Sequence, residues 1–136
     1  GLSDSPVALA AWILEKWRLW ADTGGEVESR FTRDFLLTNI TLYWATATIA
    51  TSIRDYYDNR WSPEAAIGPD DFVRVPTAVT GFRHHFAPEG NMPREWAERL
   101  YDVRRWTPMP RGGHFPAAEE PELLAADIAA FFGEYA

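Results

Sequence analysis

One histidine of the chain stands in a setting that suits proton transfer. His114 directly follows Gly112 and Gly113 and comes shortly after a predicted strand that ends at Met109. The two glycines leave backbone room for an imidazole that points into a site, where it could act as a general base. The same pattern fits a histidine whose polar atoms are satisfied at the start of a helix. The residues by themselves leave both roles open.

Two adjacent tyrosines, Tyr56 and Tyr57, lie near the end of a predicted helical segment. Neighbouring side chains on a helix point about 100° apart, so only one of the two could face a cavity and donate a hydrogen bond there. Both could instead be packing residues. His84 and His85 are adjacent as well, and their rings would diverge. Because no third ligand has a suitable spacing, we do not expect them to form a metal site.

The first part of the chain is predicted to be helical. Ser5 and Pro6 form a favourable helix start, with a hydroxyl cap and proline at the first helical position. The run Val7–Ala21 carries apolar residues three and four positions apart. A second helical start is predicted at Thr32, and the apolar segment Phe35–Ile53 has a threonine-rich middle that favours two joined helices over one straight helix.

From residue 59 onward the pattern changes to strands alternating with helices. Strands are predicted over Phe72–Val79 and Val103–Met109, with a helix over Pro93–Tyr101 between them and an amphipathic helix over Pro121–Tyr135 at the end. This order predicts an α/β fold with a parallel sheet, preceded by a helical segment. Two parallel strands do not form a sheet that is stable alone, so we expect the chain to be the final part of something larger.

Composition narrows the class of protein. The 136 residues are 46% hydrophobic and 24% charged, which suits one globular domain, and no apolar run reaches the roughly 20 residues of a spanning helix. A net charge of −7 argues against a nucleic-acid partner. The absence of cysteine excludes disulfides and thiolate chemistry, and leads us to expect a cytoplasmic protein. Aromatic residues make up 15% of the chain, enough for a sizeable core or an apolar cavity.

Three blocks of the sequence carry a family resemblance. They are GLSDSPVALAAWILEKW at Gly1–Trp17, DFLLTNITLYW at Asp34–Trp44, and RGGHF at Arg111–Phe115 followed by EEPELL at Glu119–Leu124. Together, and in this order, they resemble the microsomal-type epoxide hydrolases, which are α/β-hydrolases with a helical cap. The similarity covers nearly the whole chain.

The resemblance implies both a fold and a reaction. The fold is the C-terminal part of an α/β-hydrolase, with a helical cap segment over residues 1–60 and the last strands and helices of the core over residues 61–136. In such enzymes an aspartate attacks an oxirane carbon and forms an ester, while a cap tyrosine donates a hydrogen bond to the oxirane oxygen. A histidine then activates the water that hydrolyses the ester. A hydrophobic epoxide would become a vicinal diol, and no metal or organic cofactor is implied.

The resemblance also assigns roles to residues of this chain. His114 matches the catalytic histidine, and Tyr56 matches one of two cap tyrosines. The sequence departs from the family at the acid that orients the histidine, because His85 occupies the position of that carboxylate. Glu89, four residues further on, is the candidate substitute. An acid elsewhere could also take this place, and Glu89 could be a plain surface charge.

The nucleophile of the family has no counterpart in these residues, and neither has its oxyanion-hole segment. We therefore expect the chain to begin inside the cap, to work with the N-terminal part of the same enzyme, and to be inactive alone. Two other functions stay open. One is a degenerate relative that binds an apolar ligand without catalysis, which His85 supports. The other is a different reaction such as ester hydrolysis, against which Tyr56 argues. Homo-oligomerisation is left open.

Overall fold

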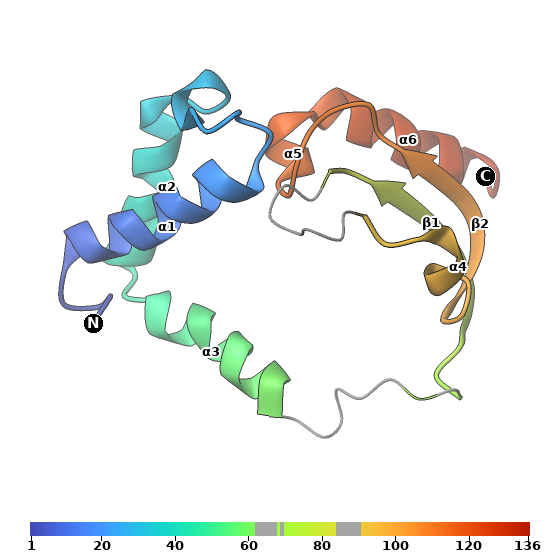
Figure 1. Cartoon of the computed structure of the whole chain (residues 1–136), viewed down its shortest axis with the longest axis horizontal. Helices are drawn as coiled ribbons and strands as arrows, with labels where there is room; N and C mark the ends of the chain where they lie inside the picture. The colour runs from blue at the N-terminus through green and yellow to red at the C-terminus, as the bar shows by residue number, and fades with distance from the viewer. Residues whose placement is uncertain (62–67, 69, 84–90) are drawn as a thin grey trace. The chain divides into compact units, whose positions relative to one another are not determined.

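The computed structural model describes residues 1–61, 68, 70–83 and 91–136 (Figure 1). The chain divides into two units. The first contains Gly1–Arg18 and Thr23–Ile67, and the second contains Leu19–Asp22 and Gly68–Ala136. The assignment of residues 1–60 to a cap and 61–136 to a core stays a prediction.

The helices before residue 62 are α1 (Pro6–Trp20), the 3₁₀ helix η1 (Val27–Ser29), α2 (Arg33–Ala45) and α3 (Ile49–Trp61). Of these, α1 and α2 begin where the sequence predicts a capping residue. The Ser5 hydroxyl accepts a hydrogen bond of 3.2 Å from the N–H of Ala8, and the Thr32 hydroxyl accepts one of 3.2 Å from the N–H of Phe35. These bonds satisfy N–H groups that have no partner inside a first helical turn.

A sharp break separates α2 from α3. Ala47 adopts φ 53°, a left-handed conformation that is rare for a residue with a side chain. The Thr46 hydroxyl donates to the carbonyl of Leu42 at 2.6 Å, so this side chain competes for a helical carbonyl at the end of α2. The prediction of two joined helices in this segment is confirmed.

A small apolar core holds the first unit together. Leu9 and Ile13 of α1 pack with Ile40 of α2 and Ile49 of α3, and all four are buried. An aromatic cluster extends this core. The Trp17 ring lies edge-on to the rings of Phe31 and Phe35, with distances between ring centres of 4.7 Å and 5.2 Å. Both the core and the cluster join segments that are far apart in the sequence, so they fix the helix arrangement within this unit.

The second unit contains the predicted parallel pair of strands. Its elements are β1 (Val73–Gly81), α4 (Arg94–Ala97), β2 (Tyr101–Pro108), α5 (Pro116–Glu119) and α6 (Pro121–Gly133). β1 and β2 pair in parallel from Val73 opposite Tyr101 to Gly81 opposite Pro108. The register shifts between Val73 and Pro76, because a proline has no N–H to contribute to the ladder.

Several boundaries in this unit differ from the prediction, and β1 extends to Gly81 where the predicted strand ends at Val79. The expected helix over Pro93–Tyr101 is only the single turn α4, because pairing with β1 draws Tyr101 into β2. Strand β2 therefore begins earlier than the predicted Val103. The short helix α5 was not predicted, and it separates the His114 loop from α6. None of the helices in the described part of the chain is long and apolar enough to cross a membrane.

A buried carboxylate fastens α6 to both strands. Asp127 is 5% exposed and accepts hydrogen bonds from the hydroxyls of Thr80 on β1 and Thr107 on β2. It also accepts a bond of 2.7 Å from Nε of Arg105 on β2. Burial by itself would raise the pKa of Asp127, but the hydrogen bonds from Thr80, Arg105 and Thr107 outweigh burial and lower this pKa. The side chain is therefore charged at neutral pH.

We predict that Asp127→Asn destabilises the protein by about 1–3 kcal/mol at pH 7, because it removes the charge that three donors share. A group with a lowered pKa in the folded state stabilises the fold above its unfolded pKa of about 3.9, and this contribution disappears as pH falls through the folded value. The difference in thermal midpoint between wild type and variant should therefore hold from pH 7 to about 4 and shrink below it. Glu134→Gln, an exposed change just after α6, is the control. Equal midpoints for Asp127→Asn and wild type at pH 7 would contradict this role.

Candidate active site

His114 lies on the loop that leads from β2 to α5, as predicted. Its side chain is exposed, while its main-chain N–H donates to the carbonyl of Trp20 at 3.0 Å. The imidazole packs edge-on against the rings of Trp20 and Phe115, with distances between ring centres of 4.9 Å and 5.1 Å. The histidine therefore has an anchored backbone, a ring with aromatic neighbours, and access to solvent.

The loop begins at the carboxyl ends of both strands. The N–H of Met109 donates to the carbonyl of Gly81 at 2.8 Å, and the N–H of Arg83 donates to the carbonyl of Gly112 at 3.2 Å. These bonds hold the start of the loop beside the end of β1. The carboxyl edge of a parallel sheet is where open α/β folds bind their ligands, so His114 follows the edge at which chemistry is expected.

The two glycines before His114 are required by close contacts. A Cβ on Gly113 would lie 2.6 Å from the carbonyl oxygen of Trp20 and 2.7 Å from the nitrogen of Asp22, and both are main-chain atoms that cannot turn away. Gly112 has φ 94°, and a Cβ there would lie 2.8 Å from the ring of Phe82. The sequence pattern had suggested that the glycines make room for the imidazole. The structure shows that they make room for neighbouring main chain and for an aromatic ring.

Two carboxylates that sequence reasoning did not single out hold this loop. Oε2 of Glu119 accepts hydrogen bonds from the N–H of Gly113 at 2.9 Å and from the N–H of Asp22 at 2.7 Å. Oε1 of Glu119 accepts one from the N–H of Phe115 at 2.9 Å. The Asp22 carboxylate accepts one from the N–H of Gly112 at 3.1 Å. The sequence does not distinguish Glu119 from an ordinary surface glutamate. What distinguishes it is its burial, to 8% exposure, which only the structure shows.

A third carboxylate beside the loop has a different partner. Glu120 is 6% exposed and forms an ion pair of 2.9 Å with Nε of Arg111. A hydrogen bond from Arg111 to Glu120, together with the attraction of the two charges, raises the pKa of the guanidinium. Among the described residues, no group of three or more histidine, aspartate or glutamate side chains is placed to hold a metal ion.

The predicted tyrosine belongs to the first unit. Tyr56 and Tyr57 lie on α3 with exposed fractions of 63% and 67%. Their similar exposure does not distinguish them, so the choice of Tyr56 stays a prediction. His85 and Glu89 lie outside the described residues, and the identity of the acid stays a prediction as well.

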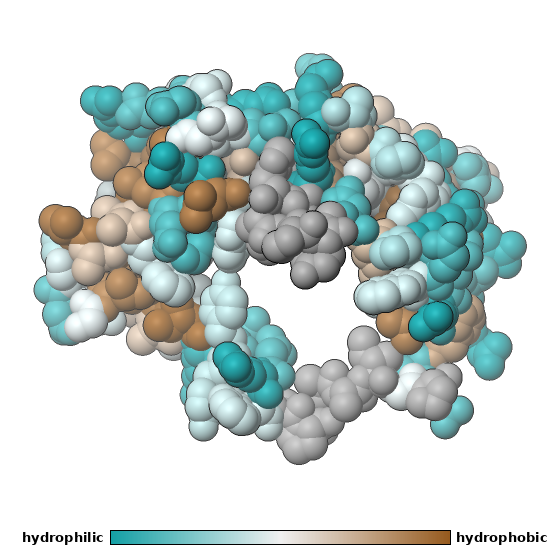
Figure 2. Space-filling view, in the orientation of Figure 1, coloured by the Kyte–Doolittle hydropathy of each residue, from teal (hydrophilic) through white to brown (hydrophobic). Residues whose placement is uncertain are grey.

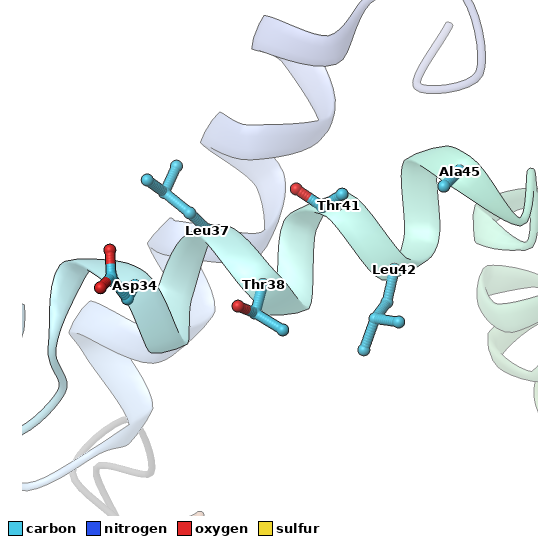
Figure 3. Close-up of a pocket in the computed structure, with 6 residues that line it drawn as sticks. All are labelled: Asp34, Leu37, Thr38, Thr41, Leu42 and Ala45. Carbon is cyan, nitrogen blue, oxygen red and sulfur yellow. The ribbon is translucent and has the colours of Figure 1, made fainter.

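Two hollows lie away from these side chains. In the second unit, a cavity of about 380 Å³ lies at the carboxyl ends of β1 and β2, between residues 79–82 and 91–94. In the first unit, a shallow depression runs along α2, where Leu37 and Leu42 are exposed beside Asp34, Thr38 and Thr41 (Figure 3). Figure 2 shows hydrophobic surface in the same region, over α1 and α2. His114 and Tyr56 do not line either hollow.

Comparison with known proteins relates the chain to one group of enzymes. No family model matches it. The chain is 41% identical to epoxide hydrolase 1 of Oryctolagus cuniculus over 140 residues, covering 97% of this chain and 30% of that protein. It is 40% identical to juvenile hormone epoxide hydrolase 2 of Ctenocephalides felis over 136 residues, covering 93% of this chain and 28% of that protein.

Solved structures give the same result. The crystal structure of juvenile hormone epoxide hydrolase from the silkworm Bombyx mori matches with a TM-score of 0.82 and 34% identity, covering 99% of this chain and 35% of that one. The structure of Aspergillus niger epoxide hydrolase matches with a TM-score of 0.75 and 29% identity, covering 98% of this chain and 31% of that one.

These matches show the class of fold. The chain has the fold of the C-terminal part of an α/β-hydrolase, as the resemblance implies. Over nearly its whole length the chain is similar to epoxide hydrolases, which confirms the resemblance carried by its three sequence blocks. The chain spans about 30% of the length of the curated relatives that it matches.

We predict that Gly113→Ala lowers the thermal midpoint by several degrees, with a cost of about 1–3 kcal/mol, because the added methyl meets main-chain atoms. Amide hydrogen exchange in residues 109–115 should rise at the same time. Gly133→Ala at the end of α6 is the matched control: nothing lies within 4 Å of its Cβ position, so stability should stay equal or increase slightly. An unchanged midpoint for Gly113→Ala would show that the loop accepts a side chain there.

Proposed function

We propose that this chain is part of an enzyme that hydrolyses a hydrophobic epoxide to a vicinal diol through an ester intermediate. The observation that carries the proposal is the similarity to epoxide hydrolases over 97% of the chain in sequence and 99% in structure. The esterified aspartate and the oxyanion-hole groups would come from outside these 136 residues. The N-terminal part of the same enzyme would supply them.

In the first half-reaction, a carboxylate oxygen of that aspartate attacks an oxirane carbon. A carbon–oxygen bond of the epoxide breaks and an ester forms, while the former ring oxygen takes a proton from its phenol donor and becomes a hydroxyl. We propose that Tyr56 donates the hydrogen bond to this oxygen as negative charge develops on it. An exposed phenol on α3 is accessible for such a contact, which supports this role.

In the second half-reaction, water attacks the ester carbonyl and loses a proton to His114. The ester's leaving oxygen takes the proton from His114, which releases the diol. The second proton of the water leaves the restored aspartate and returns to the phenol, so the net reaction adds one water to the epoxide. An exposed imidazole on an anchored backbone suits this role, because a general base must reach solvent while its position is held. Glu89 would orient the ring and stabilise its charged form.

The half-reactions provide a test in the complete natural polypeptide, with styrene oxide as the probe. We predict that His114→Ala forms the ester at the normal rate and then accumulates it, which intact-mass measurement detects as a stable adduct. Tyr56→Phe should slow ester formation by about 10- to 1000-fold, because it removes a donor to the developing alkoxide. Tyr57→Phe is the matched control and should behave as wild type. Equal losses at both steps in both variants would refute these roles.

The acid has its own test. Glu89→Gln keeps the size and removes the charge, so we predict that ester hydrolysis falls by a factor of about 10²–10⁴ while ester formation persists. His85→Asp restores the carboxylate that the family resemblance implies and should partly rescue Glu89→Gln. If Glu89→Gln turns over normally, Glu89 is a surface charge. If His85→Asp alone raises activity sharply and Glu89→Gln has no effect, the degenerate, ligand-binding relative becomes the better interpretation.

A further inference from the structure

The main chain around His114 is tied down at four consecutive N–H groups. The N–H of Gly112 donates to the carboxylate of Asp22, and the N–H of His114 donates to the carbonyl of Trp20. The N–H groups of Gly113 and Phe115, on either side of the histidine, both donate to the carboxylate of Glu119. Two of the four bonds therefore end on one side chain.

Glu119 also joins this loop to a distant segment. Its Oε2 accepts from the N–H of Asp22 at 2.7 Å, while the same oxygen accepts from Gly113 at 2.9 Å. The carboxylate is 8% exposed and its hydrogen bonds go to three main-chain N–H groups. A buried carboxylate is stable only when donors surround it, and bonds between a charged acceptor and N–H groups are stronger than neutral ones.

The bonds require a carboxylate and not merely a polar side chain. Both oxygens of Glu119 act as acceptors, with two donors on one oxygen and one on the other. A glutamine has one acceptor oxygen, and its amide nitrogen would place N–H groups against an N–H donor. In either orientation it would leave at least one of the flanking groups, Gly113 or Phe115, without an acceptor.

We propose that Glu119 is a positioning residue for ester hydrolysis: it holds the peptide groups on both sides of His114 so that the imidazole keeps its orientation toward the water. This role rests on the proposed function of His114. Glu119 acts through the main chain and leaves the imidazole nitrogens to the reaction. A shift of the ring by about 1 Å is enough to lower a rate by about 10²-fold, so a main-chain anchor can control the rate of this step.

The test compares Glu119→Gln with Glu120→Gln in the complete natural polypeptide, again with styrene oxide. The two residues are adjacent, similarly buried and changed in the same way. Glu120 forms an ion pair with Arg111, whereas the N–H groups of Gly113 and Phe115 donate to Glu119. We expect Glu119→Gln to form the ester within twofold of the wild-type rate and to hydrolyse it about 10- to 100-fold more slowly. Glu120→Gln should leave both rates within twofold of wild type.

A double variant separates positioning from general loss of structure. If Glu119 acts through His114, then adding Glu119→Gln to His114→Ala should cause no further loss of ester hydrolysis. The rise of the hydrolysis rate with pH that a histidine base produces should also flatten in Glu119→Gln. If Glu119→Gln does not fold, Glu119→Asp keeps the charge with a shorter reach, and it should slow hydrolysis selectively.

Three results would overturn the proposal. One is an equal loss of both half-reactions in every soluble Glu119 variant, and another is an additive loss in the double variant. The third is normal hydrolysis by Glu119→Gln. Failure of the proposed function would look different: the wild-type enzyme would form no ester, or His114→Ala would hydrolyse it normally, and the positioning role would then fall with it.

Discussion

The structure around the candidate catalytic residue depends on one close approach between main chains. Gly113 lies so near the Trp20–Asp22 backbone that even a methyl group would overlap it. This proximity lets the His114 N–H reach the Trp20 carbonyl and lets one glutamate bind N–H groups of both segments. Without it, the loop would need other acceptors for its N–H groups, and an unpaired buried N–H is costly.

Two buried carboxylates of the second unit use their charge in different ways. Asp127 binds side chains of both strands and so fastens a helix to the sheet. Glu119 binds main-chain groups and so determines the path of a loop. In each case the donors compensate the cost of removing a charge from water, and the surroundings become intolerant of a neutral substitute. The first arrangement supports the fold, and the second supports the residue on which we propose the chemistry depends.

The proposed reaction divides its tasks between the two units. Ring opening needs a donor for a developing alkoxide, and Tyr56 on α3 provides an exposed phenol. Ester hydrolysis needs a base that is held in place and yet open to water, and we propose His114, on the loop after β2, for this role. Similarity to epoxide hydrolases covers both units, although the chain spans only about 30% of those curated relatives.

Local physical chemistry made much of this protein readable from its sequence. The hydroxyls of Ser5 and Thr32 mark helix starts, and the threonine-rich middle of Phe35–Ile53 marks a break between helices. Both are readable from the sequence because a capping or β-branched side chain affects only the backbone within about one helical turn of it. The strand–helix–strand order predicted the parallel pair, and the glycine-flanked His114 was placed on its loop. The sequence blocks also indicated the similarity to epoxide hydrolases that the comparisons bear out. The roles of His114, Tyr56, His85 and Glu89 stay predictions.

Only the tertiary structure decided what depends on contacts between distant residues. Glu119 and Asp22 are 97 positions apart, and no local pattern indicates that one carboxylate serves both segments. The reason for Gly113 likewise lies in the backbone of Trp20–Asp22 and not in its own neighbours. The helix predicted over Pro93–Tyr101 is shorter in the structure, because Tyr101 pairs with β1 and is part of strand β2. The intrinsic helix propensity of a short segment is weaker than the hydrogen bonds between two paired strands. Those hydrogen bonds form only when the chain has folded, so the sequence of the segment does not predict them.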